Sequence, residues 1–308
     1  MRDRRGAVMM RSVPDVGLPA LCAYRPELIR TLANQLPKGT LRLGAAVARV
    51  HSEGVQLEDG TEAVADVVIG ADGLRSKVRD FVFGEGHRPI YRGYVVWRGM
   101  TRMPSSVVEG EVFESWGRGQ RFGLFGAGQG RAYWYATANK PEGAVESDGA
   151  RKHELQRRFA DWHEPIQEVI DSTGEAAILC GNTYDLRPRP GWSRGRAVLI
   201  GDAAHASTPN LGQGGCMALE DALVLARCLG AAPSPADGFQ EFERARFRRT
   251  RRVTRESLWI GRLGQAAGVF ATARDLFSRL TPGTMQADRQ RSLFDYDADA
   301  VSLACGKA

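Results

Sequence analysis

The feature that most constrains the fold is a short apolar strand that leads directly into a glycine-rich turn and a helix. Residues 196–200 read RAVLI, residues 201–205 read GDAAH, and residues 211–215 read LGQGG. Apolar side chains then recur at helical spacing over residues 216–229, as Ala218, Ala222, Leu225, Ala226 and Leu229. A short apolar strand is typical of a buried sheet, and in open α/β folds ligands bind where such strands end. The segment therefore predicts a layered α/β domain with a ligand site just after residue 200.

The residues of this turn suit a large ligand that carries negative charge. The carboxylate of Asp202 can accept hydrogen bonds from sugar or ribitol hydroxyls, and the small Ala203 and Ala204 let a ligand lie close to the backbone. Residues 212–215 supply nearly bare backbone N–H groups at the start of a helix, where the partial positive charge favours an anion. A reduced flavin is an anion along its pyrimidine edge, so a flavin fits this loop.

The whole segment, RAVLIGDAAHASTPNLGQGGCMALEDALVLA, is similar to the second FAD-binding motif of the group A flavoprotein monooxygenases. That family includes para-hydroxybenzoate hydroxylase and zeaxanthin epoxidase. The resemblance implies that Asp202 contacts the ribitol or ribose region of FAD and that its neighbours Gly201 and Ala203 also bind the cofactor. It also implies that a second set lies beside the isoalloxazine ring, namely Pro209, Leu211, Gly212, Gln213, Gly214 and Gly215.

Two further segments resemble motifs of the same family. Residues 66–80 read DVVIGADGLRSKVRD, and the resemblance links Asp72 and Gly73 to the binding of both FAD and NAD(P)H. Taken alone, this Asp-Gly pair is also typical of a simple turn. Tyr24-Arg25-Pro26-Glu27-Leu28 resembles a looser element in which an arginine, here Arg25, begins a helix that contacts FAD. A lone arginine at a helix start is otherwise more often structural.

The middle of the chain differs in composition from the rest. Residues 85–180 are rich in Gly, Tyr, Trp and Phe, and turn signals recur among them. This pattern predicts an antiparallel sheet, interrupted by a helix over 151–172. Trp97-Arg98 and the run Tyr133–Tyr135 are candidates for the border of an aromatic substrate pocket, although core or sheet packing explains them at least as well. Further on, we expect a loop over 231–238 and one long helix over 239–265.

The predicted fold is an α/β fold with an incomplete Rossmann-like FAD-binding domain, an inserted antiparallel β-sheet substrate domain and a C-terminal helical segment. We assign residues 1–84 and 180–230 to the FAD-binding domain, 85–179 to the substrate-binding sheet, and 231–308 to the C-terminal helices. The first domain is incomplete because no GxGxxG occurs in residues 1–80, where the family has a strand, this glycine motif and a helix. A missing βαβ unit predicts an open sheet edge and exposed apolar faces.

Three explanations of that absence stay open: a wrongly assigned start, a degraded gene, or a second chain that completes the fold. The glycine motif admits the pyrophosphate of the cofactor to a helix N-terminus. We therefore expect this 308-residue chain to bind FAD weakly or not at all.

Composition excludes several other classes of protein. The formal net charge is +6, but residues 244–255 contain seven arginines and no acid, and without them the charge falls to −1. This local run favours a solvated helix face over binding to nucleic acid, an acidic membrane or a partner protein. The five cysteines, at positions 22, 180, 216, 228 and 305, have no CxxC spacing, which argues against a zinc site or a disulfide framework. We expect no metal, no nucleic-acid partner, no membrane span and a cytoplasmic location; the oligomeric state stays open.

The function implied by the resemblance is a monooxygenase reaction, a hydroxylation or epoxidation. FAD, reduced by NAD(P)H, reacts with O2 and transfers one oxygen atom to a small, aromatic substrate. The flavin carries the chemistry, so no side-chain nucleophile is required, and we assign no catalytic base. His205 is commonly part of the packing of its motif. Two alternatives stay open: a non-catalytic remnant or interaction protein that keeps the fold without FAD, and a related flavin-dependent reductase. A halogenase is disfavoured because the chain contains no W-x-W-x-I-P string.

Overall fold

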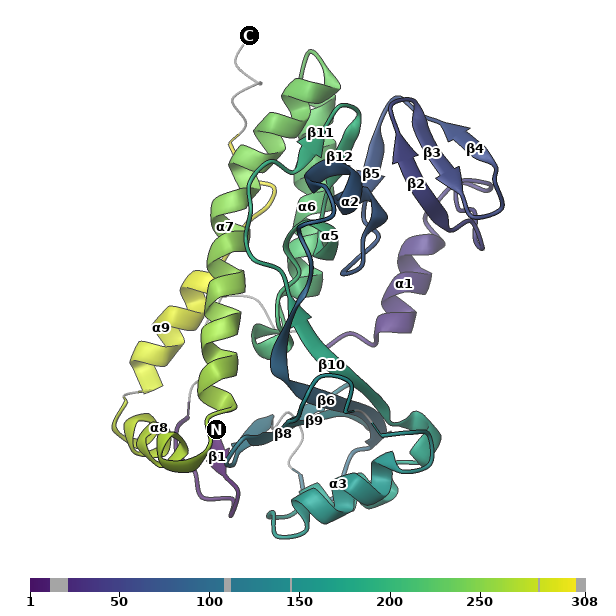
Figure 1. Cartoon of the computed structure of the whole chain (residues 1–308). Coiled ribbons are helices and arrows are strands. Elements are labelled where there is room, and N and C mark those ends of the chain that lie inside the picture. The colour runs from purple at the N-terminus through teal and green to yellow at the C-terminus, as the bar shows by residue number, and fades with distance from the viewer. Residues whose placement is uncertain (12–21, 108–111, 145, 282, 303–308) are drawn as a thin grey trace. The chain divides into compact units, whose positions relative to one another are not determined.

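The computed structural model describes residues 1–11, 22–107, 112–144, 146–281 and 283–302 (Figure 1). Its strands are β1 (Arg2–Asp3), β2 (Val47–His51), β3 (Gly54–Leu57), β4 (Glu62–Val64), β5 (Val68–Gly70), β6 (Ile90–Arg102), β7 (Phe113–Trp116), β8 (Gln120–Gly126), β9 (Arg131–Asn139), β10 (Leu179–Asp185), β11 (Ser193–Arg194) and β12 (Ala197–Leu199). Its α-helices are α1 (Arg25–Ala33), α2 (Lys77–Phe83), α3 (Arg151–Phe159), α4 (Ile166–Ser172), α5 (Asp202–His205), α6 (Gly214–Ala231), α7 (Pro235–Gly264), α8 (Gly268–Leu280) and α9 (Gly283–Phe294). Short 3-10 turns cover Glu175–Ala177 and Pro209–Leu211.

The chain forms two compact units. Unit 1 contains residues 1–38, 93–183 and 262–295, and unit 2 contains residues 39–92, 184–261 and 296–308. This division differs from the sequence-based domain bounds, since residues 1–38 group with the middle sheet and most of α7 groups with the motif-bearing strands. The bounds 1–84 with 180–230, 85–179 and 231–308 stay a prediction about domains.

Unit 1 is built on a six-stranded sheet with the order β1-β7-β8-β9-β6-β10 (Figure 1). Strands β6, β9, β8 and β7 pair antiparallel, and the two-residue β1 adds a parallel edge to β7. The predicted antiparallel sheet over residues 85–180 is confirmed. Side chains alternate between the two faces, so the face of each residue follows from the strand register.

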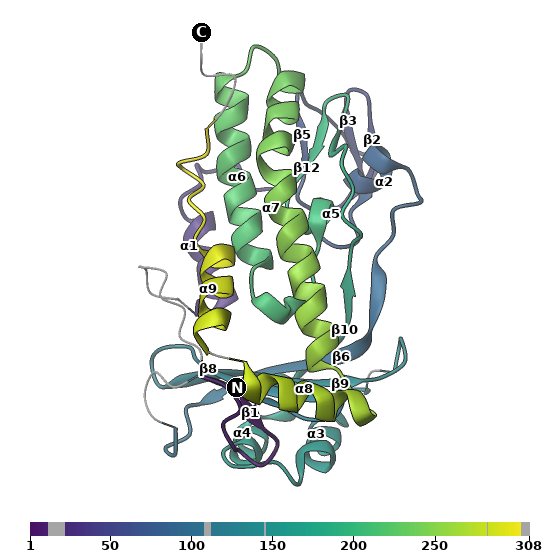
Figure 2. The same cartoon turned by 90° about the vertical axis from the view of Figure 1, so that its left-hand side faces the viewer.

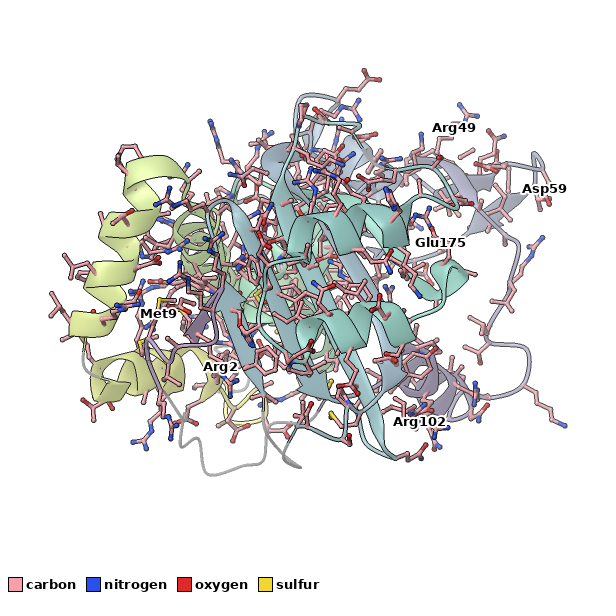
Figure 3. All side chains as sticks on the ribbon, turned by 90° about the horizontal axis from the view of Figure 1, so that it is seen from below. Arg2, Met9, Arg49, Asp59, Arg102 and Glu175 are labelled. Atoms are coloured by element: carbon pink, nitrogen blue, oxygen red, sulfur yellow. The ribbon has the colours of Figure 1, made fainter. Side chains whose placement is uncertain are left out.

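One face of this sheet carries the main core of unit 1. Trp97, Phe122 and Trp134 are fully buried there and pack with Leu155 and Phe159 of α3. Trp97 is therefore a core residue. Figure 3 shows the two helices of residues 151–172 lying across the sheet.

The single helix expected over residues 151–172 is wrong, because the segment forms α3 and α4 with a break between residues 159 and 166. Pro165 lies at the start of the second helix, and proline has no N–H to continue a helix across that point. Because of the break, the second helix packs Ile166, Val169 and Ile170 into the same core as the first.

Unit 2 contains the three-stranded sheet β11-β12-β5, in which β5 and β12 run parallel. Its core gathers Trp192, Val198, Val224 and Phe242 from this sheet and from α6 and α7. Figure 2 shows α6 and α7 side by side along their length, and side-chain hydrogen bonds join them. A separate antiparallel sheet, β2-β3-β4, completes the unit.

The ends of α6 and α7 differ from the expectation. The loop predicted over 231–238 is wrong, because α7 already begins at Pro235. Proline suits the first helical turn, and the Ser234 hydroxyl accepts the Asp237 N–H at 3.3 Å as a cap. Gly230 lies inside α6, which continues to Ala231.

Strand β5 is the terminal strand of its sheet among the described residues. Ile69 at its centre is about half exposed, as are Leu219 and Leu223 on the outer side of α6. An open edge with apolar surface beside it was expected from the sequence. In the part of the chain that the structure describes, no helix is both long and apolar enough to cross a membrane.

Candidate functional site

Parallel strands β5 and β12 bring two of the predicted motifs to the same edge of one sheet. Val68 lies opposite Ala197 and Gly70 opposite Leu199, and the Ile200 N–H donates to the Gly70 carbonyl at 3.0 Å. Both strands therefore end at the same level. The turn that contains Asp72 and the turn that contains Asp202 leave this carboxyl edge together, where open α/β sheets bind ligands.

Arg79 joins the two turns. Its side chain is buried, and its guanidinium donates to the carbonyl oxygens of Gly73 and Leu74 in the first turn and of Ala203 in the second, at 3.4, 2.5 and 3.2 Å. The Nε atom donates to the His87 carbonyl at 3.2 Å. Burial lowers the pKa of Arg79. One cation thus holds the backbone of both motifs, although they lie far apart in the sequence.

Asp72 caps helix α2. Its Oδ2 atom accepts the N–H groups of Lys77 at 2.7 Å and Val78 at 3.2 Å, and the Ser76 hydroxyl accepts the Arg79 N–H at 2.8 Å. Asp72 is nevertheless exposed, and Gly73 has a positive φ of 77°. The Asp-Gly pair is therefore a structural turn in this structure, and its predicted contact with FAD and NAD(P)H stays a prediction.

Gly201 requires a conformation that other residues avoid. Its φ is 56° and its ψ is −140°, and a Cβ atom would lie 3.1 Å from the Cβ of Ala218. Its N–H donates to the Asp221 carboxylate at 2.9 Å. This contact fixes the point at which β12 turns into α5.

Asp221 is the centre of a buried charge network in α6. It has no exposed surface, and it contacts His205 Nε2 at 2.6 Å and accepts from Arg246 Nε at 2.7 Å. Arg246, also fully buried, pairs with Glu220 at 2.6 Å, and Arg249 pairs with the same glutamate. His205 packs its ring near Trp192, with centroids 5.3 Å apart, so its expected packing role is confirmed.

The charges in this network stabilise one another. Burial alone would raise the pKa of Asp221, but His205 and Arg246 outweigh burial and lower it below the usual value. Burial would likewise lower the pKa of Arg246, and Asp221 with Glu220 raises it. The buried face of α6 is Met217, Asp221, Val224, Leu225 and Cys228, which differs from the expected stripe because Ala222 and Ala226 are exposed. Sequence reasoning missed both Asp221 and Arg246.

The glycine-rich loop ends in an uncapped helix start. Gly212 is left-handed, Gln213 is the N-cap of the 18-residue α6, and no side chain caps that end. A Cβ atom on Gly214 would meet nothing closer than 3.8 Å, with Asp202 Oδ1 at 3.9 Å, and one on Gly215 would meet nothing within 4 Å. The first amides of a long helix therefore lie open beside a carboxylate, as an anionic ring edge and a ribitol chain would require.

The remaining predicted site residues are Pro209 and Leu211, which lie in this loop, and Arg25, which lies outside it. Pro209 and Leu211 form the short turn before Gly212, and Asn210 between them donates to the Thr208 hydroxyl and the Ser257 carbonyl at 2.8 and 2.9 Å. Arg25 begins α1 in unit 1, where it is exposed. Its predicted contact with FAD stays a prediction.

The predicted absence of a metal site rested on the scattered cysteines and histidines. The described residues contain no group of three or more His, Cys, Asp or Glu side chains that could hold a metal ion. Cys22, Cys180, Cys216 and Cys228 are free thiols, and Cys305 lies outside the described residues.

In unit 1, the sheet face opposite the core carries aromatic and polar side chains. Arg98 lies opposite Tyr135 across β6 and β9, and Phe125 lies opposite Tyr133 across β8 and β9. The Phe125 ring is 6.3 Å from Tyr133 and 6.0 Å from Tyr135. Gly123 leaves the space that the Tyr135 ring occupies, since a Cβ there would meet the ring at 2.4 Å. The result is a continuous aromatic surface with the Arg98 guanidinium beside it.

The two phenols of this surface stay protonated at neutral pH. Burial raises the pKa of Tyr133, and the positive charge of Arg98 offsets this only in part. Burial and the charge of Glu114 raise the pKa of Tyr135 well above its usual value. Both groups are thus neutral hydrogen-bond donors.

Comparison with known proteins identifies the family to which this chain belongs. The model of the family described as an FAD binding domain matches residues 44–257, which include both motif turns. The chain belongs to the FAD-binding monooxygenase family. It is 42% identical over 261 residues to the aurachin C monooxygenase/isomerase of Stigmatella aurantiaca, covering 83% of this chain and 68% of that protein. It is 39% identical over 224 residues to the chloroplastic zeaxanthin epoxidase of Nicotiana plumbaginifolia, covering 71% of this chain.

Among solved structures, Klebsiella pneumoniae HpxO in complex with FAD and uric acid matches with a TM-score of 0.82 and 28% identity. That match covers 87% of this chain and 71% of HpxO. The chain spans only 34% of the zeaxanthin epoxidase. The α/β fold of the FAD-binding monooxygenases and FAD as the cofactor of the family are therefore confirmed.

Proposed function

We propose that this protein is an FAD-dependent monooxygenase that uses NAD(P)H and O2 to hydroxylate or epoxidise a small aromatic substrate. The observation that carries this proposal is the meeting of the Asp72 and Asp202 turns at one sheet edge, joined by Arg79, inside a region that matches the FAD-binding family. Two relatives are named as an aurachin C monooxygenase/isomerase and a zeaxanthin epoxidase, and both names denote oxygen insertion. The structure of HpxO contains bound uric acid.

The residues of unit 2 would hold the flavin end of the cofactor. Asp202 would accept hydrogen bonds from ribitol hydroxyls, and the open amides of Gly214 and Gly215 would stabilise negative charge on the pyrimidine edge. When bound, FAD supplies the hydride acceptance and the oxygen activation that side chains do not provide. Pro209 and Leu211–Gly215 would border the ring, as the family resemblance implies.

The aromatic sheet face of unit 1 is the proposed recognition surface for the substrate. Tyr133, Phe125 and Tyr135 offer aromatic rings to a planar substrate, and the neutral phenol of Tyr133 would donate a hydrogen bond to one of its oxygen atoms. Arg98 offers a positive charge to a phenolate or an enolate. These groups suit an oxygen-bearing aromatic ring better than a saturated hydrocarbon.

The test is turnover with added FAD. The protein is incubated with excess FAD, NADH or NADPH, and a panel of hydroxyquinolines, hydroxybenzoates and urate, and isotopically labelled O2 is traced into the product. We expect one ring class to accelerate NAD(P)H oxidation and to acquire one labelled oxygen atom. Reduction of the flavin without incorporation of label for any substrate would instead identify a flavin-dependent reductase and overturn the proposal.

A further inference from the structure

Helix α8 turns an apolar face outward from unit 1. Ala271, Arg274 and Ser278 form its buried side, whereas five large apolar side chains are between 60% and 78% exposed. These are Val269, Phe270, Leu276, Phe277 and Leu280. Their spacing of three, four and seven residues places them on one continuous face of the helix. A patch of this kind on the order of several hundred Å² marks an interaction surface.

Polar contacts attach the other flank of α8 to the rest of unit 1. Arg279 pairs with Asp3 at 3.2 Å, and Arg274 donates to the Gly117 carbonyl at 3.0 Å while its guanidinium lies over the Trp116 ring. The helix is therefore held with its apolar face away from the sheet. Figures 1 and 2 both show α8 beside β1, in agreement with the contact between Arg279 and Asp3.

A hollow of about 500 Å³, with four arginines and three aspartates in its lining, reaches α8 at Asp275. Its lining includes Arg4, Arg5, Arg118 and Arg158, together with Asp275 of α8 itself. Asp275 is paired with Arg274, Asp3 with Arg279 and Arg158 with Glu154, and Asp161 is a further exposed acid of the lining. Arg4, Arg5 and Arg118 have no ion pair among the described residues.

Trp116 also lines this hollow. The indole N–H of Trp116 is buried and has no hydrogen-bond partner among the described residues. The arginines of the hollow suit the phosphate oxygens of a headgroup, and Asp275 places the hollow on the polar side of α8, away from its apolar face.

We propose that α8 is a membrane-docking helix, which lies in the plane of an anionic lipid bilayer with its apolar face among the acyl chains and the neighbouring arginines at the phosphate groups. An interfacial helix combines an exposed apolar face with basic side chains at its border, and both are present here. A second copy of the chain would cover the apolar face but would leave the unpaired Arg4, Arg5 and Arg118 without acidic partners, so it fits less well. The proposal is independent of the proposed monooxygenase activity.

The test is flotation of the full 308-residue chain with vesicles of phosphatidylcholine, with and without phosphatidylglycerol. The wild type should float with the anionic vesicles, and added salt should weaken that binding. The double variant F270S/F277S should bind at least about tenfold more weakly, since two exposed rings lose their insertion into the bilayer. The matched control L43S/V64S changes two equally exposed apolar residues of unit 2 and should bind like the wild type.

A charge-reversal variant separates the arginine contribution. R4E/R5E/R118E should lose the preference for anionic vesicles, whereas free inorganic phosphate should not compete with vesicles for the wild type. All variants alter exposed side chains, and circular dichroism verifies that they are folded. Two outcomes overturn the proposal: equal flotation of F270S/F277S and the wild type, or a wild-type dimer that does not bind vesicles and that F270S/F277S converts to a monomer.

Discussion

Replacement of Asp221 by asparagine should destabilise the protein more than any change to an exposed carboxylate. Asparagine keeps the shape of the side chain, but it removes the negative charge that Arg246 and His205 face at 2.7 and 2.6 Å. Loss of one partner from a buried ion pair costs about 3–5 kcal/mol. We expect about 3 kcal/mol, at the lower end, because Glu220 still pairs with Arg246 at 2.6 Å. That loss corresponds to a melting temperature lowered by roughly 6–12 °C.

The pH dependence of this effect follows from the lowered pKa of Asp221. Because the pKa in the folded state lies below the unfolded value of about 4, the stabilisation is fully present above that pH. It is lost as the pH falls through the folded-state pKa. The difference between the wild type and Asp221→Asn should therefore be largest near neutral pH and should shrink in acid.

The assay is thermal unfolding followed by circular dichroism, with Asp66→Asn as the control. Asp66 is fully exposed, and its ion pair with Arg196 is long at 3.9 Å, so we expect no measurable change in the melting temperature. The double variant D221N/R246M should recover part of the loss, since it leaves no unpaired buried arginine. A melting temperature of Asp221→Asn within 2 °C of the wild type, roughly the effect of 1 kcal/mol, would refute the reasoning.

Three more predictions concern the motif turns. Gly201→Ala should cost about 1–3 kcal/mol in chemical denaturation, because of the positive φ and the nearby Ala218, and a neutral effect would show that the turn relaxes freely. Arg79→Lys should cost about 2–4 kcal/mol and weaken flavin binding, because an ammonium group cannot reach the carbonyls of both turns, whereas the exposed Arg75→Lys should do neither. Since no GxGxxG occurs in the printed sequence, the 308-residue chain should bind FAD weakly and with nearly the same affinity as FMN in a fluorescence titration. Purification of this chain as a yellow protein with stoichiometric FAD would contradict that last expectation.

The parts of the site that could be predicted from sequence are those that depend only on residues adjacent in the chain. Asp202 directly follows an apolar strand, and the glycines directly precede a helix. These adjacent residues were enough to predict the loop and the sheet edge on which it lies. The start of α7 also has a local signal, because Ser234-Pro235 is typical of the first residues of a helix. The break at Pro165 had the same kind of local signal.

The missed features depend on contacts between distant segments. Asp221 and Arg246 lie on different helices, and a charge in a helix ordinarily indicates a solvated face. Their burial results from the packing of α6 beside α7, two helices whose contact no local pattern predicts (Figure 2). Helix α8 shows the opposite case, since an apolar stripe ordinarily indicates the buried face of a helix, and here it is the exposed face.

The most direct test of the flavin site compares two glycines of α6. Gly215 lies at the open start of the helix and Gly230 near its end, and a Cβ atom on either would meet nothing within 4 Å. Leucine should therefore be tolerated structurally at both positions, with melting temperatures at or above that of the wild type. In a fluorescence titration with FAD, G230L should bind like the wild type, and G215L should lose binding because its side chain occupies the space of the flavin ring. Equal flavin binding by G215L and the wild type would contradict the assignment of this helix start as the flavin site.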